Sequence, residues 1–255
     1  MLDRYLLCGI SCAGLLFCPS LEGQPSGLTL ISGEATVSST DHNMLIQSGE
    51  KTILDWNHFS LAEREHLHFQ QASKEASILN RVIGPEASHI LGHLSSNGKV
   101  FLINPAGIVV GANARIETSG FLASTFDVLN EDFLQERNLA FQGESESSLV
   151  NRGVIQAAEG DIFLVARRVV NEGSLEAPEG RVVLEAGCDI LLRPEGSQHR
   201  FIRTHSLEEE AALENSGTIA AAVAELRSTA NPYAKAICHR GNILSIKEGG
   251  VKSFW

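Results

Sequence analysis

Short hydrophobic runs alternate along this chain with glycine, asparagine and proline. The clearest example is Asn97–Thr125, which reads NGKVFLINPAGIVVGANARIETSGFLAST. Its apolar runs are too short for a helix, and the residues between them are typical of turns. These turn residues tolerate left-handed backbone angles or preset a turn at low steric cost; they are Asn97, Gly98, Asn104, Pro105, Gly107, Gly111 and Gly120. The pattern predicts an all-β chain that coils from strand to corner to strand.

A repeat in the second half predicts how the strands stack. LVNRGVIQAAEGDIFLVA at Leu149–Ala166 aligns with VVNEGSLEAPEGRVVLEA at Val169–Ala186, and a third copy begins near Asn215. A period of roughly 20 residues is typical of a solenoid in which each repeat stacks on the previous one. We predict a right-handed, single-stranded parallel β-helix, with the hand taken from the usual chirality of parallel crossovers.

The Asn-x-Gly corners of the repeat predict specific contacts. Glycine adopts a positive φ at low cost, and asparagine both tolerates that angle and hydrogen-bonds its own backbone. Asparagines at matching positions in successive coils can also bond one another in a ladder. We therefore expect Asn151 to stack on Asn171, and Leu164 to stack on Leu184.

Two segments predict short excursions from the coil. Asp127–Phe141 has apolar residues at helical spacing, with Asn130 placed to cap a helix, and Ser206–Leu213 opens with a Ser-x-x-Glu capping box. The open amino end of a solenoid must also be covered, because exposed strand edges aggregate. We expect Leu28–Leu61 to form this cap, with Trp56 and Phe59 closing the core.

The first residues differ in composition from the rest. Residues 1–23 combine a short charged head, an apolar run over Tyr5–Phe17 and small residues suited to cleavage, which is the pattern of a signal peptide. A lipid-attachment site at Cys18 is the alternative, although the bulky Phe17 before the cysteine fits it poorly. We expect residues 24–255 to form one exported domain without stable membrane insertion, because no later apolar run reaches the roughly 20 residues of a bilayer span.

Charge and cysteine content narrow the partners. The formal net charge is −11 and basic residues are scattered, which argues against nucleic acid as a partner. Cys188 and Cys238 are the cysteines beyond the leader, and their separation exceeds two predicted coils. A disulfide needs α-carbons within roughly 7 Å, so we expect two buried thiols rather than a bridge.

Several blocks, taken together, resemble one family. In order, they are ILDWNHFSL at Ile53–Leu61, SILNRVIG at Ser77–Gly84, ILGHLSSNGKVFLINPAGIVVGA at Ile90–Ala112, GFLASTFDV at Gly120–Val128 and NPYAKAICHRGNI at Asn231–Ile243. The chain resembles the amino-terminal secretion domain of filamentous haemagglutinin-type exoproteins, which leave Gram-negative bacteria by two-partner secretion. Ala106 stands where the family motif usually has a second asparagine, and no Asn-Pro-Asn-Leu motif is visible upstream.

The resemblance implies a function and a set of residues. It implies a β-helix exported to the periplasm, recognised by the periplasmic domains of an outer-membrane β-barrel transporter, and secreted or displayed on the cell surface as an adhesin, with a host glycan or protein as a further partner. By position in the family motif, the residues for transporter recognition or folding are Asn104, Pro105, Gly107 and Ile108, with Asn80 and Arg81 as additional candidates. A tight turn needed only for folding is the alternative role of these residues.

Candidate chemistry is sparse. His66 and His68 point to the same side of a strand, and His89 and His93 stand four apart, but neither pair has the further ligand of a recognisable zinc site. We predict no metal, no cofactor and no catalysis. Two alternatives remain open: a secreted polysaccharide lyase or hydrolase, which needs clustered acids, and the delivery module of a contact-dependent toxin. The expected neighbours Asp161 and Arg181 suit a structural contact.

Overall fold

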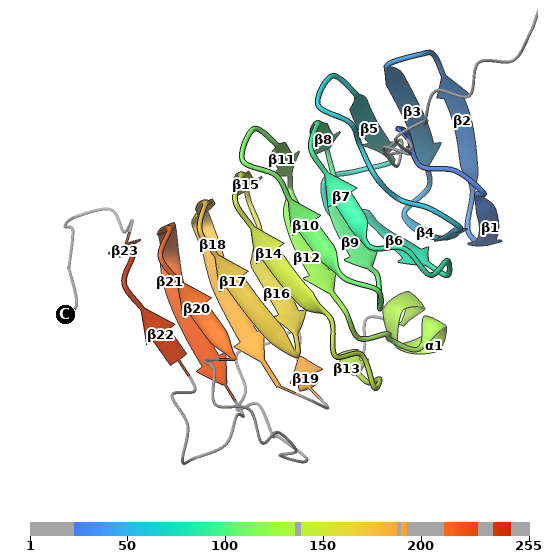
Figure 1. The fold of residues 1–255 in the computed structure, drawn as a ribbon. Helices are drawn as coiled ribbons and strands as arrows, with labels where there is room; N and C mark the ends of the chain where they lie inside the picture. Colours follow the sequence, from blue (N-terminus) through green and yellow to red (C-terminus); the bar gives the residue numbers. More distant parts are fainter. Residues whose placement is uncertain (1–22, 136–138, 188–189, 193–211, 229–236, 246–255) are drawn as a thin grey trace, which may run out of the picture.

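A computed structural model describes residues 23–135, 139–187, 190–192, 212–228 and 237–245. Within these ranges strands follow one another along an axis, from β1 at one end to β23 at the other, with a short helix beside them (Figure 1). The elements are β1 (Thr29–Ser32), β2 (Ala35–Ser39), β3 (Asn43–Ser48), β4 (Lys51–Trp56), β5 (His66–Gln71), β6 (Ser77–Val82), β7 (Ser88–Ile90), β8 (His93–Ser96), β9 (Lys99–Ile103), β10 (Ile108–Val110), β11 (Arg115–Thr118), β12 (Gly120–Ser124), α1 (Asn130–Leu134), β13 (Leu139–Phe141), β14 (Ser148–Asn151), β15 (Val154–Ala157), β16 (Ile162–Ala166), β17 (Arg168–Asn171), β18 (Ser174–Ala186), β19 (Ile190–Leu192), β20 (Leu213–Asn215), β21 (Thr218–Ser228), β22 (Ile237–His239) and β23 (Asn242–Ser245).

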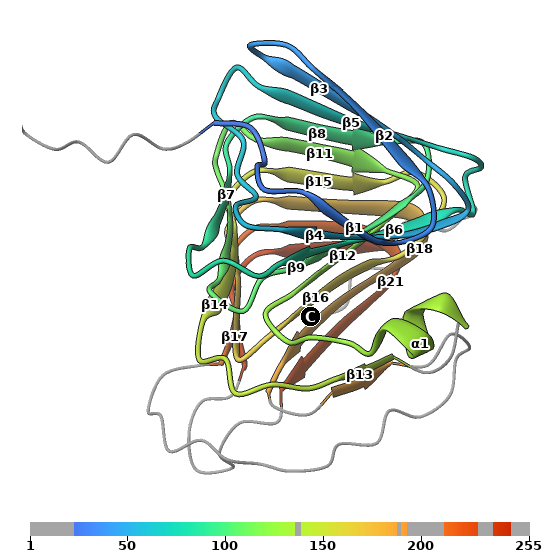
Figure 2. The same ribbon diagram turned by 90° about the vertical axis from the view of Figure 1, so that its right-hand side faces the viewer.

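The strands line three sides of a common interior (Figure 2). One side stacks β4, β6, β9, β12, β16 and β18 in parallel. A second side stacks β3, β5, β8, β11, β15 and β18, again in parallel. The third side is a separate parallel sheet with the order β22-β20-β17-β14-β10-β7. The all-β, parallel architecture predicted from the repeat is therefore confirmed.

Side-chain alternation fills the interior. On β5, Leu67 and Phe69 point inward and are fully buried, while His66 and His68 lie on the outer surface. The repeat predicts the register correctly, because Leu164 on β16 pairs directly with Leu184 on β18 and both are fully buried. Stacked apolar columns of this kind exclude water from the whole length of the interior, which is the main stabilising contribution to the fold.

The amino-terminal end departs from the parallel pattern. β1 pairs antiparallel with β4, and β2 pairs antiparallel with β3. Behind them, the rings of Trp56 and Phe59 meet edge to face with centroids 5.6 Å apart, and each side chain is 1% exposed. The two aromatic residues expected to close the core at this end are thus part of it.

A second, smaller hydrophobic cluster lies outside the coil. It joins outward-facing residues of β4, β6, β9, β12 and β16 to the segment that includes α1 and β13, which we call the strap (126–135 and 139–141). Phe133 of α1 packs edge to face on Phe101 of β9, with ring centroids 5.2 Å apart. The strap is the excursion predicted for Asp127–Phe141, and it covers apolar side chains that would otherwise face solvent.

Two details of the sequence-based expectations need correction, and others lie outside the described residues. Leu129 occupies the N-cap of α1, and Asn130 is the first residue inside the helix, because its side chain is engaged by an arginine described below. Cys238 is free but half-buried rather than buried, because it lies on the outward-facing side of β22. Cys188 and almost all of Ser206–Leu213 lie outside the described residues, as do residues 1–22 of the predicted leader.

The corner glycines are required for a reason other than the one predicted. A positive φ is confirmed at the turn glycine Gly107, but not at the Asn-x-Gly corners. Among the described glycines, the others with a positive φ are Gly27, Gly33, Gly143 and Gly187. A Cβ added to a corner glycine would collide with the backbone oxygen of the preceding coil. The separations from that oxygen would be 2.1 Å for Gly173, 2.0 Å for Gly217 and 1.9 Å for Gly241. Close stacking of the coils, not a left-handed turn, therefore excludes larger residues here.

Candidate functional site: the Asn104 turn and its supporting networks

The Asn104 side chain holds together the turn between β9 and β10. Its Oδ1 accepts a hydrogen bond from the backbone N–H of Ala106 over 2.9 Å. Its Nδ2 donates to the Glu86 carbonyl and to Ser88 Oγ, each over 2.9 Å. The Gly107 N–H closes the turn by donating to the Asn104 carbonyl over 3.0 Å. One buried amide thus ties this turn to the preceding coil, which is the usual way to satisfy a buried polar group.

The turn exposes only part of the motif. Asn104 and Ile108 are fully buried, whereas Pro105 is exposed. Gly107 has a φ of 116°, a backbone conformation that residues with a side chain rarely adopt. Ala106, which replaces the family's usual asparagine, is half-buried, and its N–H still bonds Asn104. The turn therefore keeps its geometry with alanine at this position.

Asn80 is fully buried in the interior behind Trp56. Its Oδ1 accepts from Trp56 Nε1 over 3.1 Å, and its Nδ2 donates to the Phe101 carbonyl over 3.3 Å. The indole N–H and the amide would each be costly to bury without a partner. Asn80 and Asn104 come from different coils, and the structure gives them separate hydrogen-bond partners.

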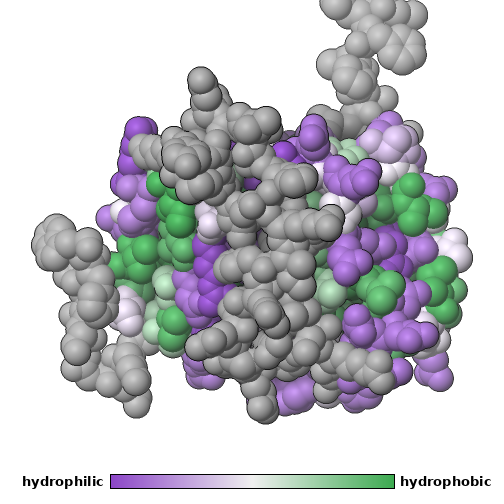
Figure 3. Space-filling view, turned by 90° about the horizontal axis from the view of Figure 1, so that it is seen from below, coloured by the Kyte–Doolittle hydropathy of each residue, from purple (hydrophilic) through white to green (hydrophobic). Residues whose placement is uncertain are grey.

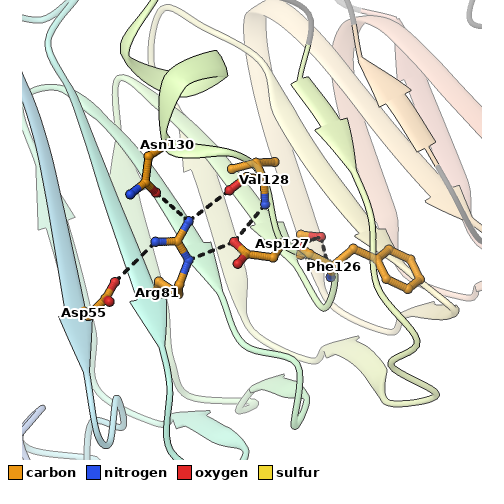
Figure 4. A network of polar contacts seen from close by, with 7 residues as sticks. Asp55, Arg81, Phe126, Asp127, Val128 and Asn130 are labelled. Atoms are coloured by element: carbon orange, nitrogen blue, oxygen red, sulfur yellow. Dashed lines mark hydrogen bonds and ion pairs between the residues drawn. The ribbon is translucent and has the colours of Figure 1, made fainter. Parts of the chain in front are cut away.

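Arg81, the next residue, points outward and fastens the strap (Figure 4). Its Nε donates to Asp127 Oδ1 over 2.8 Å, and its Nη1 lies 3.3 Å from Asp55 Oδ1. Its Nη2 donates to the Val128 carbonyl and to Asn130 Oδ1, each over 2.9 Å. The guanidinium therefore joins β4 and β6 to both the entry and the helix of the strap, and Lys51 adds a bond from Nζ to the Leu134 carbonyl over 2.7 Å.

The asparagine ladder runs along the third side of the solenoid. Asn151 Nδ2 donates to Asn171 Oδ1 over 2.8 Å, and Asn171 Nδ2 donates to Asn215 Oδ1 over 2.7 Å. The Asn215 side chain then meets His239 Nδ1 over 2.9 Å. The ladder is longer than the pair expected from the repeat, and its last member is a histidine that precedes Gly241 in the same corner pattern.

Sequence reasoning missed a buried carboxyl on the outer face of β18. Glu185 is fully buried, and neither carboxyl oxygen has a hydrogen-bond partner among the described residues. Burial raises the pKa of Glu185 to about 7, although the neighbouring Arg227 opposes this shift. Burial also lowers the pKa of Arg227, whose Nη2 pairs with Glu225. The alternation of strand residues is the one sequence signal for this position, and it places residue 185 on the outer side of β18, which ordinarily faces solvent.

On the face seen from below, hydrophilic and hydrophobic residues are interspersed among the described residues (Figure 3). Within the described ranges, no helix has the length and hydrophobicity needed to cross a membrane. The Asp161–Arg181 neighbours predicted from the repeat are an ion pair between coils, with Arg181 Nη2 2.8 Å from Asp161 Oδ2.

The fold and the networks define a class of protein, a parallel β-solenoid domain with an outer strap. Comparison with known proteins then identifies the family, because the model of the TPS secretion domain matches residues 23–248. The chain belongs to this family of two-partner secretion domains. The resemblance recognised from the sequence blocks is therefore confirmed.

Curated relatives are much longer than this chain. A heme/hemopexin-binding protein of Haemophilus influenzae (strain ATCC 51907 / DSM 11121 / KW20 / Rd) is 32% identical over 178 residues, which cover 66% of this chain and 20% of the relative. A second heme/hemopexin-binding protein of Haemophilus influenzae is 34% identical over 120 residues, covering 46% of this chain and 13% of the relative. The matched region is thus about a fifth of the first relative's length.

Two solved structures share the fold. The HMW1 secretion domain from Haemophilus influenzae has a TM-score of 0.67 and 25% identity, covering 86% of this chain and 64% of that one. The filamentous hemagglutinin secretion domain has a TM-score of 0.53 and 14% identity, covering 86% of this chain and 98% of that one. The second likeness shows the fold alone.

Proposed function

We propose that this chain directs the export of an exoprotein through a partner outer-membrane β-barrel transporter. TPS secretion domains work with such a transporter, and membership of the family supports the same role here. In this proposal residues 1–23 are a signal peptide that delivers the chain to the periplasm of a Gram-negative bacterium. Residues 24–255 then form the secretion domain, which is secreted or held at the cell surface.

The burial of the family motif supports recognition before folding. Asn104, Ile108 and Asn80 are each fully buried in the folded domain. A transporter domain that contacts these side chains must therefore meet them in an unfolded chain, before the coils close. This order of events suits a narrow pore, because an unfolded chain is thinner than a finished solenoid.

Folding outside the cell is the next step of the proposal. We infer that the antiparallel pairs β1/β4 and β2/β3, with Trp56 and Phe59 behind them, act as the amino-terminal cap on which later coils stack. A solenoid stabilised by contacts between neighbouring coils can grow in one direction from such a nucleus. We assign it the right hand on the general preference of parallel crossovers.

Secretion of Asn104→Ala tests the recognition role. The parent and the variant are expressed with the partner transporter, and the exported fraction is measured beside a thermal melt of each purified protein. Asn171→Ala is the matched control, because Asn171 is equally buried and bonds two neighbours outside the motif. We expect each variant to lose about 2–4 kcal/mol of stability, since buried partners are left unpaired.

The two variants separate recognition from folding. If the transporter contacts Asn104, the exported fraction of Asn104→Ala should be well below that of Asn171→Ala, although the two variants lose similar amounts of stability. Equal export by the two variants would contradict a recognition role and leave Asn104 as a folding residue alone.

Binding to a host-cell glycan or protein, as an adhesin, is our proposal for the full-length exoprotein. The names of the two curated relatives state a different ligand, heme or hemopexin. Assays of the full-length protein against host cells, hemopexin and heme distinguish these ligands. The Asp161 carboxylate pairs with Arg181 of the next coil, which favours a structural contact over a role in a lyase or hydrolase site. A toxin-delivery role is tested by sequencing the complete gene.

A further inference from the structure

Three histidines gather on the outer surface of two neighbouring coils near the amino end. His66 and His68 lie on the same face of β5, because strand side chains alternate and Leu67 between them points into the core. His93, at the start of β8, pairs directly with His66 across the parallel strands. Sequence spacing grouped His93 with His89, but the strand register places it beside His66 instead.

Two of the three imidazoles, those of His66 and His93, are in direct contact. The His66 and His93 rings have centroids 4.1 Å apart, and His66 Nε2 faces His93 Nδ1. His68 uses its Nδ1 for Ser95 Oγ over 2.8 Å, which leaves Nε2 as its nitrogen available to a ligand.

Glu117 determines which nitrogen of the uncharged His93 ring carries the proton. Its Oε2 lies 2.9 Å from His93 Nε2, and its Oε1 accepts from Arg115 Nε over 2.6 Å. An ionised carboxylate has no proton to donate, so Glu117 accepts the hydrogen bond from His93 Nε2. In the uncharged His93 ring the proton therefore lies on Nε2, and Nδ1 keeps its lone pair directed at His66.

A carboxylate that bonds the far nitrogen of a histidine is the usual outer support of a metal-binding imidazole. We propose that His66, His68 and His93 bind one divalent transition-metal ion of the zinc class, with Glu117 as the positioning residue for His93. Uncharged imidazole nitrogens suit zinc, copper and nickel better than calcium or magnesium. Three protein nitrogens would leave the remaining coordination position of a tetrahedral ion to water or to another ligand.

Binding requires the rings to move apart. Within the described residues, no three potential ligands already surround one point. His66 Nε2 and His93 Nδ1 face each other directly, so an ion bound by both must replace their contact. His66 is exposed and the His93 side chain is 27% exposed, so both rings have space to turn about their side-chain bonds.

Equilibrium dialysis of the purified chain with Zn²⁺ at pH 7.5 tests the site. We expect one Zn²⁺ per chain, a rise in melting temperature that grows with Zn²⁺ concentration, and an absorption spectrum typical of four-coordinate Co²⁺ when Co²⁺ replaces zinc. His66→Gln and His93→Gln should abolish all three results. Glu117→Gln should keep the stoichiometry and weaken binding by about 10-fold to 100-fold, the usual effect of losing an outer-shell partner.

His89→Gln is the matched control, because His89 is a half-buried strand histidine on a different side of the solenoid. It should bind Zn²⁺ like the parent chain. Melts of the metal-free variants show whether each is folded, and His66→Gln should be, since that side chain is exposed. Absence of binding by the folded parent chain at 100-fold excess Zn²⁺ would overturn the proposal. So would binding that His66→Gln and His93→Gln leave intact.

Discussion

Two acid–arginine pairs lie at opposite ends of one outward-facing column of residues, and their surroundings differ. At the amino end Asp55 on β4 pairs with Arg81 on β6, and at the carboxyl end Glu185 on β18 pairs with Arg227 on β21. The Arg81 guanidinium bonds two carboxylates, a carbonyl and an amide, whereas both Glu185 oxygens are buried without a partner in the described part of the chain. The pairing of an acid with an arginine in the strand register therefore does not show by itself whether the pair stabilises the fold.

The difference arises from the strap. Val128 and Asn130 reach Arg81 because the strap crosses the outer face of β4, β6 and β9. The strap thus supplies the polar atoms that make burial of the first pair favourable. Glu185 lies on the same face without such a supply from the described residues.

Substitution of a corner glycine of the repeat should cause the largest loss of stability in the carboxyl-terminal half. Gly173→Ala would place a Cβ 2.1 Å from the Gly153 backbone oxygen, and the coils cannot separate locally without breaking the strand pairs on both sides. We expect a loss of about 3–5 kcal/mol in the free energy of unfolding, measured by chemical denaturation.

A glycine of the amino-terminal half serves as the comparison. The Cβ of Gly111→Ala would meet a methyl of the Leu91 side chain at 2.7 Å, and the next nearest atoms lie at 3.6 Å. A side chain can turn aside, so we expect a loss of about 1 kcal/mol. Similar losses in the two variants would show that coil separation is not what forbids a Cβ at Gly173.

Removing the arginine should release the strap. Arg81→Ala leaves Asp55 and Asp127 without their cation, and we expect a loss of about 2–3 kcal/mol of stability concentrated in the strap. Hydrogen exchange should show faster exchange in residues 126–135 while β16 and β18 stay protected. Arg152→Ala, which breaks an exposed ion pair with Glu172, should leave strap exchange unchanged. Unaltered exchange in Arg81→Ala would contradict the fastening role.

At the carboxyl end, removing the charged group should stabilise the fold, whereas Arg81→Ala destabilises it. The size of this effect depends on pH. The pKa of Glu185 is raised from 4.5 to about 7 in the folded chain, so the folded state holds this proton more tightly than the unfolded state. Its contribution to stability is therefore full below about pH 4.5 and is lost as the pH rises toward 7. Glu185→Gln removes the ionisation and should stabilise the chain by about 1–2 kcal/mol at pH 8.

The same variant should differ little from the parent at pH 4.5, where the carboxyl is protonated in the folded chain. Melting temperatures at the two pH values provide the measurement. Destabilisation by Glu185→Gln at pH 8 would show that the charge interaction with Arg227 outweighs the cost of burying the carboxylate.

The regular features of the fold could be predicted because they depend on residues that lie close together in the sequence. Repeated spacing predicts that Leu164 stacks on Leu184, and the family blocks locate the Asn104 turn. The reason for the corner glycines could not be predicted, since it lies in the distance to the coil below. Asn130 was misassigned as a cap because its true partner, Arg81, is far away in the sequence.

By itself the sequence determined that this chain is made of short parallel strands, which residues face inward, and to which family it belongs, because alternation and repeat length are properties of consecutive residues. Only the tertiary structure decided which outward-facing residues become buried, and which histidines become neighbours. The physical reason is that stacking brings together residues of successive coils. His66 meets His93, and Glu185 meets Arg227, through a register that the closing of each coil sets.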